Sequence, residues 1–166
     1  GYLPPRWLQR REALLRAQDL LAELPSLPPG ASPRATALLA ELASALAATD
    51  PYQRGRPERR ARLSAELARE LNLPDGQARR LQLAARLQDI GLAEVPSEIL
   101  DQAGRLEEAE GNLVRRHPAI AAGLIGPWVE PEVTEAVPTH HEHLDGGGYP
   151  RGLSGAAIPP LGALLV

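Results

Sequence analysis

Cysteine, methionine and phenylalanine are absent from this chain of 166 residues, and histidine occurs only four times. Without cysteine there are no disulfide bonds and no thiolate ligands, so any metal site has to use histidine and carboxylate. No apolar run approaches the roughly 20 residues of a membrane-spanning helix, and residues 1–15 carry charges where a secretory signal would be apolar. We therefore expect a cytoplasmic protein without a membrane span.

The chain also lacks a large excess of charge of either sign. The 18 basic and 21 acidic residues give a formal net charge of −3, and the arginines are interleaved with Asp and Glu. A protein that binds duplex DNA or RNA needs a strongly basic surface, so this class of partner is disfavoured. The 43% hydrophobic composition, rich in Leu and Ala, is enough for one substantial core.

Apolar residues recur at helical spacing through most of the chain, and no stretch alternates with the period of a strand. The sequence therefore predicts an all-α fold. The expected helices cover residues 5–24, 33–48, a stretch opening at 57, 77–89, 107–116, 119–125, 131–143 and a start at 159. Ser32 is the expected N-cap of the second helix, followed by Pro33 at its first position. Leu63, Leu67 and Leu71 are expected on the buried face of the third helix. The fourth is expected to turn one side inward, namely Leu81, Ala84, Ala85 and Gln88.

A segment rich in Pro, Ser and Gly at residues 25–33 predicts a linker. We therefore divide the chain into an N-terminal helix with its linker, residues 1–30, and a main domain, residues 31–166. The first helix has three interpretations that the sequence leaves open: it packs against the main domain, belongs to an upstream domain, or forms a homodimer contact.

The histidines are concentrated in one part of the chain. His140 and His141 lie beside each other and lead into a glycine-rich loop that ends in Tyr149 and Pro150. Together with Asp89 and His117, they lie near the ends of predicted helices, from which side chains can converge on one divalent metal. Adjacent helical residues diverge by about 100°, so both can serve one ion only where the pocket wraps around the helix end. The alternative for His117, which precedes a proline, is a cap or a surface residue.

These residues resemble the HD-GYP family. The similarity extends over about residues 35–166 in a set of ordered motifs. They are Asp50-Pro51-Tyr52, Gly55-Arg56-Pro57-Glu58-Arg59, Gln88-Asp89-Ile90-Gly91-Leu92, Val95-Pro96, Arg116-His117-Pro118, Ala121-Ala122-Gly123, His140-His141-Glu142 through Asp145-Gly146 to Gly148-Tyr149-Pro150, and Ile158-Pro159.

The resemblance implies an HD-superfamily helical bundle, a metallohydrolase fold that cleaves cyclic-di-GMP with two or three metals, commonly iron or manganese. It implies that the ligand positions are Asp89, His117, His140 and His141, and that His143 lies outside the ligand set. The motif loop is implied to be shaped by Glu142, Asp145, Gly146, Gly148, Tyr149 and Pro150. Arg151, next to this loop, is interpreted as a solvated surface residue, with a phosphate or partner contact as the alternative.

Three positions depart from the family pattern. Arg56 and Gln88 replace two histidines, and Leu92 replaces a lysine. Arginine has no lone pair to donate to a metal, and an amide is a poor substitute for imidazole. The family's last ligand, an aspartate, would follow Val166, so we expect the bundle to be truncated at its C-terminal end.

We therefore expect a degenerate domain in bacterial cyclic-di-GMP signalling, with hydrolysis lost or weak. It would sense the nucleotide or dock a protein, such as one with a diguanylate cyclase domain. The alternatives are an active phosphodiesterase with a reduced metal site and a purely structural domain. We expect one divalent ion (Fe, Mn or Zn) or none, with Arg56 supplying the charge of a lost ion by pairing with Asp89.

Overall fold

The structure is a computed structural model that describes residues 4–165, and it is all-α, as the sequence predicts. Its α-helices are α1 (Arg6–Ala22), α2 (Pro33–Ala48), α3 (Arg56–Glu70), α4 (Asp75–Leu87), α5 (Ser97–Leu100), α6 (Glu108–Val114), α7 (His117–Ile125) and α8 (Pro131–Ala136). Short 3₁₀ helices are η1 (Ile90–Glu94), η2 (Val137–Thr139), η3 (Gly155–Ala157) and η4 (Gly162–Leu164). Within the described residues there is no strand, only an isolated antiparallel bridge between Asp145 and Ser154.

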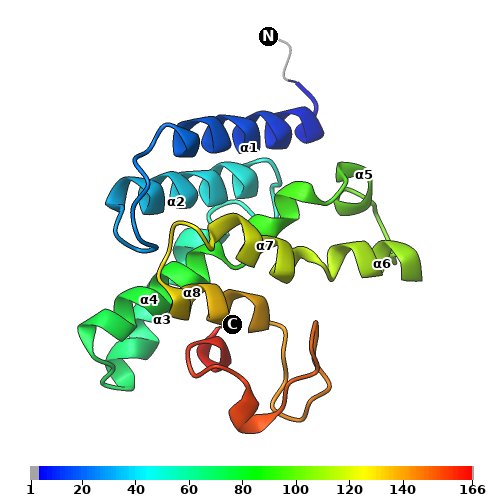
Figure 1. The fold of residues 1–166 in the computed structure, drawn as a ribbon. Coiled ribbons are helices and arrows are strands. Elements are labelled where there is room, and N and C mark those ends of the chain that lie inside the picture. The colour runs from blue at the N-terminus through cyan, green and yellow to red at the C-terminus, as the bar shows by residue number, and fades with distance from the viewer. Residues whose placement is uncertain (1–3, 166) are drawn as a thin grey trace.

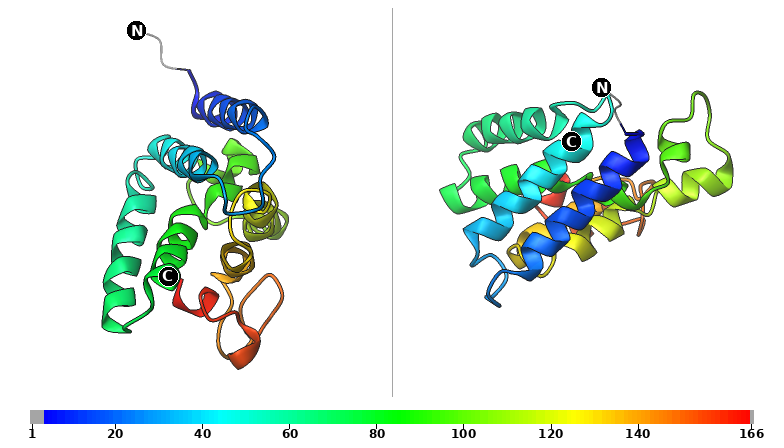
Figure 2. Two further views of the ribbon diagram at one scale, coloured as in Figure 1. Left: turned by 60° about the vertical axis from the view of Figure 1, so that its left-hand side comes forward. Right: turned by 90° about the horizontal axis from the view of Figure 1, so that it is seen from above.

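The helices form a bundle around one core (Figure 1). In this view α1, α2, α7 and α8 follow one another from top to bottom, and the C-terminal segment lies below α8. Helix α6 extends away from the other helices in Figure 1 and in the right panel of Figure 2. Helix α1 packs on α2, and its Ala17 and Leu21 belong to the same core cluster as Leu39 and Ile125.

The start of α2 confirms the predicted cap. The Ser32 hydroxyl accepts a hydrogen bond from the backbone N–H of Ala35 at 3.2 Å, and Pro33 occupies the first turn. This bond satisfies one of the amides that a helix N-terminus leaves without an intrahelical partner. The linker before α2 is held to the bundle by a 3.1 Å hydrogen bond from the Gly30 N–H to the Trp128 carbonyl.

The predicted buried face of α3 is wrong. Leu63 is 60% exposed and Leu71 is 48% exposed. The buried residues of this helix are instead small ones, namely Pro57, Ala61, Ser64 and Ala68. Helix α3 packs along α4, and small side chains let two helix backbones approach closely, so the leucines project beside the contact. The prediction for α4 is confirmed, because Leu81, Ala84, Ala85 and Gln88 are all buried.

Two further predictions fail at proline residues. The helix expected over residues 131–143 ends at Ala136 and continues only as the 3₁₀ turn η2, in which Pro138 has no N–H for an α-helical hydrogen bond. The helix expected from Pro159 does not form within the described residues, which show only the 3₁₀ turn η4 there. The four-residue helix α5 was not predicted, because it is too short to show a periodic pattern.

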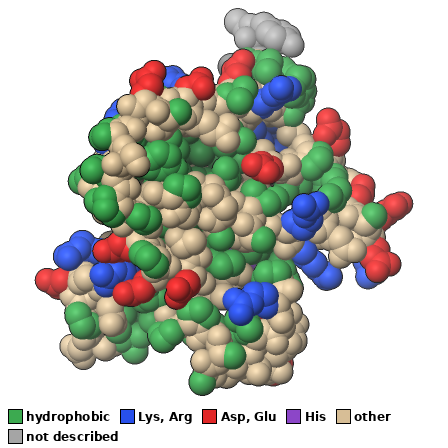
Figure 3. Space-filling view, viewed as in Figure 1, with side chains coloured by type: hydrophobic (Ala, Val, Ile, Leu, Met, Phe, Trp, Pro, Cys, Tyr) green, Lys and Arg blue, Asp and Glu red, His purple; other side chains and the backbone are tan. Residues whose placement is uncertain are grey.

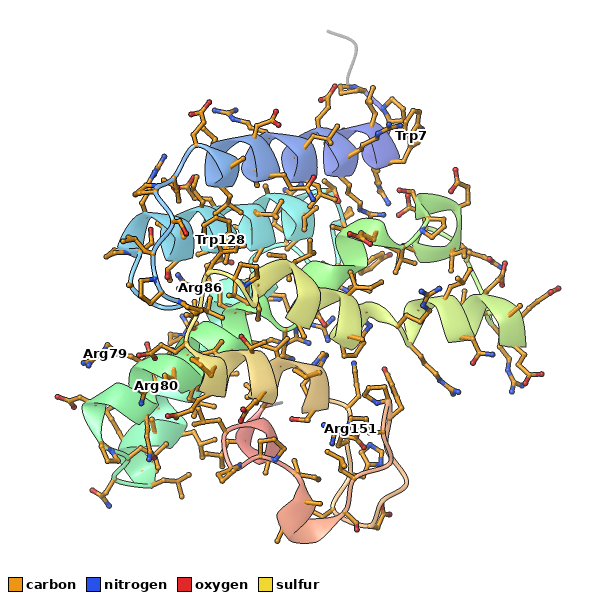
Figure 4. The ribbon with its side chains drawn as sticks, viewed as in Figure 1. Trp7, Arg79, Arg80, Arg86, Trp128 and Arg151 are labelled. Carbon is orange, nitrogen blue, oxygen red and sulfur yellow. The ribbon has the colours of Figure 1, made fainter. Side chains whose placement is uncertain are left out.

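Among residues 4–165, no helix combines the length and the apolar character required to cross a bilayer. Acidic and basic side chains are interspersed over the face shown in Figure 3. One such pair links α4 to the start of α8: the Arg80 guanidinium donates to both carboxylate oxygens of Glu130, at 2.5 and 3.3 Å (Figure 4).

Candidate metal centre

The centre begins where α4 ends and η1 starts. Asp89 lies at this junction, followed by Ile90 and Gly91, which are buried. Gly91 packs so closely on α7 that a Cβ atom at this position would overlap the carbonyl oxygen of His117 and the backbone nitrogen of Ala121. Only glycine permits this approach. The motif glycine therefore brings the first turn of α7, with His117, against Asp89.

His117 and His140 face each other across the centre. The Nδ1 atom of His117 lies 2.8 Å from the Val114 carbonyl oxygen, and that of His140 lies 2.7 Å from the Val137 carbonyl oxygen. A carbonyl oxygen can only accept, so each Nδ1 carries the donated proton. In the neutral imidazole this leaves the lone pair on Nε2. The two Nε2 atoms are 3.1 Å apart.

Asp89 completes this convergence. Its Oδ1 atom lies 3.4 Å from Nε2 of His117 and 3.5 Å from Nε2 of His140. Three acceptor atoms therefore meet at short range, and two neutral imidazoles with lone pairs facing each other cannot form a hydrogen bond between them. A cation placed among the three atoms resolves this conflict. The side chains of His117 and His140 are only 4% and 1% exposed, so bulk water offers little compensation.

His141 is the fourth member of the cluster. One potential ligand atom from each of Asp89, His117, His140 and His141 lies within 4.8 Å of the other three. The two adjacent histidines converge because η2 has ended, with His140 at its C-cap and His141 in the following turn. Two ligands about 2.1 Å from one metal in tetrahedral geometry are about 3.4 Å apart, so these spacings fit a single ion.

The pKa shifts of His141 and Asp89 leave both side chains in the form that can donate electron pairs to a metal ion. Burial, followed by electrostatic interaction with His140 and His117, lowers the pKa of His141 to about 4, so its imidazole is neutral at pH 7. Burial alone would raise the pKa of Asp89, but the close approach of His117 and His140, with the Arg60 guanidinium, holds that pKa far below its usual range. Asp89 is therefore a carboxylate. A borderline ion such as Zn²⁺, Fe²⁺ or Mn²⁺ suits this donor set.

The glycine-rich loop after His141 is built around one carboxylate. Glu142 accepts hydrogen bonds from the backbone N–H groups of Arg151 and Leu153, each at 2.8 Å. At Gly148 a Cβ atom would overlap the backbone of residues 141–143, so the loop closes only with glycine there. Gly146 adopts a positive φ of 81°. Asp145 accepts a 2.8 Å hydrogen bond from the Gly147 N–H.

The loop folds back so that Tyr149 packs against the histidine cluster. The Tyr149 ring stacks on His141, with ring centroids 4.6 Å apart and planes inclined by 15°. On the same ring, the Arg115 guanidinium lies 5.7 Å from the centroid. Burial raises the pKa of Tyr149, so its hydroxyl stays protonated. The side chains of Pro150 and Arg151 lie on the exposed part of the loop (Figure 4).

Comparison with known proteins agrees with this geometry. The family model described as HD domain matches residues 40–166, which is most of the chain. The chain belongs to the HD domain family. Its sequence motifs and its relatives place it with the HD-GYP members of that family.

Two relatives align with most of this HD domain. It is 32% identical over 154 residues to the cyclic di-GMP phosphodiesterase response regulator RpfG of Xanthomonas campestris, covering 90% of this chain and 39% of the relative. It is 37% identical over 152 residues to the 3′3′-cGAMP-specific phosphodiesterase 3 of Vibrio cholerae, covering 87% of this chain and 33% of the relative. The chain therefore spans between about a third and two fifths of the length of these relatives.

The HD domain also contains an ion pair that the sequence analysis misplaced. Arg60, not Arg56, donates to Asp89, through its Nη1 atom to Oδ2. The Arg56 guanidinium instead donates to the Gln53 side-chain oxygen at 2.7 Å. Arg56 and Arg60 are one turn apart on the same face of α3, but only Arg60, one turn further into the helix, reaches Asp89. This spacing was the available sequence signal.

A pocket of about 100 Å³ lies beside this ion pair. Arg56, Arg60 and Leu92 line it, together with Asp89 and residues of α1, α2 and α4. Gln88 is 1% exposed and lies in the interior beside Asp89 in sequence. Arg115, Arg60 and the packing of Tyr149 on His141 are features of the site that sequence reasoning did not identify. His143 is exposed and is not part of the cluster.

Proposed function

We propose that this HD-GYP domain acts in bacterial cyclic-di-GMP signalling as a nucleotide-sensing or protein-docking module, with hydrolysis lost or weak. Its single retained metal site comprises Asp89, His117, His140 and His141. The observation that supports this site most directly is the 3.1 Å approach of two Nε2 atoms that carry lone pairs. We further infer that the domain spans residues 31–166, and that residues 1–30 form an N-terminal helix and linker.

One divalent ion would supply a Lewis acid for a phosphoryl oxygen. The chain's own residues prepare that position. The carbonyls of Val114 and Val137 orient His117 and His140 through their Nδ1–H groups, an arrangement that fixes the tautomer and strengthens the ligand. Asp89 balances part of the ion's charge. Because the Asp89 side chain is 25% exposed, the centre keeps an open side for a nucleotide phosphate.

Three positions argue that hydrolysis is weak. A second ion that activates water and balances the leaving oxygen would need ligands where the chain has Arg56 and Gln88. At Leu92 an apolar side chain stands beside the pocket where a lysine would meet phosphate. Losing such interactions costs several kcal/mol of transition-state stabilisation, and each ~1.4 kcal/mol is tenfold in rate. Binding and catalysis are therefore expected to separate in this protein.

The alternative is an active metal-dependent phosphodiesterase with a reduced site. The observation that favours it is the complete four-residue cluster, with an open side at Asp89. The matched relatives are named as phosphodiesterases of cyclic di-GMP and 3′3′-cGAMP, so both nucleotides are the substrates to test. Turnover that requires both metal and His140 would establish this alternative.

Protein docking would use the loop formed by Gly147, Gly148, Tyr149 and Pro150. Leu144, just before this loop, is 71% exposed, and Glu142 holds the loop backbone, so one apolar side chain is presented beside an ordered loop. A diguanylate cyclase domain is the partner that the family resemblance suggests. We propose this contact as the route by which the nucleotide or metal state is communicated. A homodimer is the competing use of an exposed surface.

The decisive experiment measures metal content, nucleotide affinity and hydrolysis on one purified sample after reconstitution with Mn²⁺, Fe²⁺ or Zn²⁺. We expect about one ion per chain, binding of cyclic-di-GMP, and turnover that is absent or at least 100-fold below a family member with a complete set of ligands. His140→Ala should abolish metal retention. The matched control is His143→Ala, which changes an exposed histidine outside the cluster. Zero ions in the parent protein would overturn the proposed centre.

A further inference from the structure

The two oxygens of Asp89 are committed to different sides of the molecule. Oδ1 faces Nε2 of His117 and His140, at 3.4 and 3.5 Å. Oδ2 instead accepts from the Arg60 guanidinium. The Arg60 side chain is only 17% exposed, so this pair is partly shielded from water and salt. The carboxylate therefore lies between two sides of the centre. On the histidine side, His117 and His140 are suited to a metal ion. On the guanidinium side, Arg60 faces the pocket.

The guanidinium side has an excess of positive charge. Two carboxylates line its pocket, Asp50 and Asp89. Four guanidinium groups also line it, from Arg10, Arg56, Arg60 and Arg86. The remaining wall is largely apolar, contributed by side chains such as Leu46, Ile90 and Leu92, which weakens screening of these charges. A divalent ion entering here would meet repulsion rather than ligands.

Within the described residues, neither Arg56 nor Arg86 forms an ion pair with a carboxylate. Arg56 donates to the neutral Gln53 amide, which does not balance its charge. The Nε atom of Arg86 is buried without a hydrogen-bond partner. Figure 4 shows Arg86 among the helices, whereas Arg79 on the same helix points outward. Arg10 bonds Thr49 and Ser97 as well as Asp101 and is 6% exposed.

We infer that Arg60 is a built-in cation that takes a second metal ion's position on Asp89 and limits the centre to one ion. This inference rests on the proposed function, because it presupposes the ion held by the histidines. It goes further in assigning a role to a residue of α3 that the family motifs do not identify here. Arg60 is a positioning residue: it acts through Asp89 and does not ligate the ion.

The test restores the two missing histidines and then varies Arg60. Arg56→His with Gln88→His supplies imidazole at both degenerate positions. This double variant is compared with two derivatives. The first carries Arg60→Lys, which keeps the positive charge. The second carries Arg60→Gln, which removes the positive charge but can still donate a hydrogen bond to Asp89. The readout is bound Mn²⁺ per chain by elemental analysis after dialysis, with melting temperature as the folding control.

We expect one ion per chain in the double variant and its Lys derivative, and two in the Gln derivative. Two ions with Arg60 retained would overturn the inference, because the guanidinium would then not exclude the second ion. One ion in the Gln derivative would overturn it too, since removing the charge would not free the position. Zero ions in the parent protein is a separate result that overturns the proposed centre itself.

A single-substitution test applies if the multiple variants do not fold. Arg60→Gln alone removes a positive charge beside the remaining ion, so we expect the dissociation constant for Mn²⁺, measured by calorimetry, to fall at least threefold. Arg60→Lys should stay within twofold of the parent. If Arg60 only orients Asp89, the Gln variant will bind Mn²⁺ with unchanged or weaker affinity, and the inference is wrong.

Discussion

At the scale of single residues, the centre depends on close approaches that leave no room for a side chain. Gly91 lies against the His117 carbonyl, and Gly148 lies against the backbone of residues 141–143. Both glycines lie near candidate metal ligands in the sequence, but neither is itself a ligand. Their role is to bring backbone segments together, so that His117 and His141 reach Asp89.

Gly91→Ala should destabilise the fold by about 3 kcal/mol, because the new methyl group overlaps the first turn of α7 and the backbone there must move. Chemical denaturation measures this loss. The control is Gly123→Ala within α7 itself, where nothing lies within 4 Å of the added atom. That variant should gain up to about 1 kcal/mol from helix propensity. Equal effects of both changes would contradict the packing role.

Glu142→Ala should loosen the loop without unfolding the bundle. The Arg151 and Leu153 N–H groups lose their common acceptor, and each bond to a charged group contributes about 1.5–3 kcal/mol. Hydrogen exchange should therefore accelerate at these two amides by about tenfold or more. Glu135→Ala, at an exposed position of α8, is the comparison variant and should leave both rates unchanged. Unaltered exchange in Glu142→Ala would show that the loop holds itself.

At the scale of helices, the contact between α2 and α3 carries a pH-dependent interaction. The Ser44 hydroxyl donates to the Glu58 carboxylate, and this bond, against the opposing effect of burial, lowers the pKa of Glu58. A carboxyl group with a lowered pKa in the folded state stabilises the fold above its unfolded pKa. That contribution is lost as the pH falls through the folded pKa.

Glu58→Gln should therefore reduce the acid sensitivity of the fold. Between pH 7 and pH 3 the variant should lose less free energy of unfolding than the parent, and the two proteins should be closest in stability at the acidic end. Urea denaturation at the two pH values measures the difference. The effect will be small because Glu58 is exposed and its charge is screened by solvent. A parallel loss in both proteins would rule out this contribution.

At the scale of the whole molecule, α1 is part of the bundle's core. Ala17 and Leu21 are each 6% exposed and join the main core cluster. Arg10 extends from the same helix to Ser97 at 3.2 Å, which ties α1 to the segment after η1. Of the three interpretations left open by the sequence, packing against the main domain is therefore the one that the structure shows.

Leu21→Ala should accordingly lower the free energy of unfolding by about 2–4 kcal/mol, the range for a buried leucine replaced by alanine. Leu15→Ala is the matched control on the same helix, because Leu15 is 49% exposed and should cost less than about 0.5 kcal/mol. A single cooperative transition in both proteins would show that α1 unfolds with the bundle. A small effect of Leu21→Ala would indicate that α1 is only loosely attached.

Local patterns were predicted well where one residue type dictates a backbone arrangement. The Ser32 cap follows from the preference of a hydroxyl for free helix amides, and the α4 face follows from its helical period. The face of α3 was predicted wrongly because burial depends on the partner helix, and α4 accepts small side chains rather than Leu63 and Leu71. Periodicity alone cannot identify that partner.

The amino-acid sequence by itself determined the all-α class, the family and the chemistry of the ligands, since histidine and carboxylate are the only strong metal donors that it offers. Only the tertiary structure decided that Asp89, His117 and His140 meet, and that Arg60 rather than Arg56 takes the second oxygen of Asp89. The physical reason is distance along the chain. Residues from three different helix ends become neighbours only when packing sets the helices' positions, and a choice between two arginines one turn apart depends on that packing.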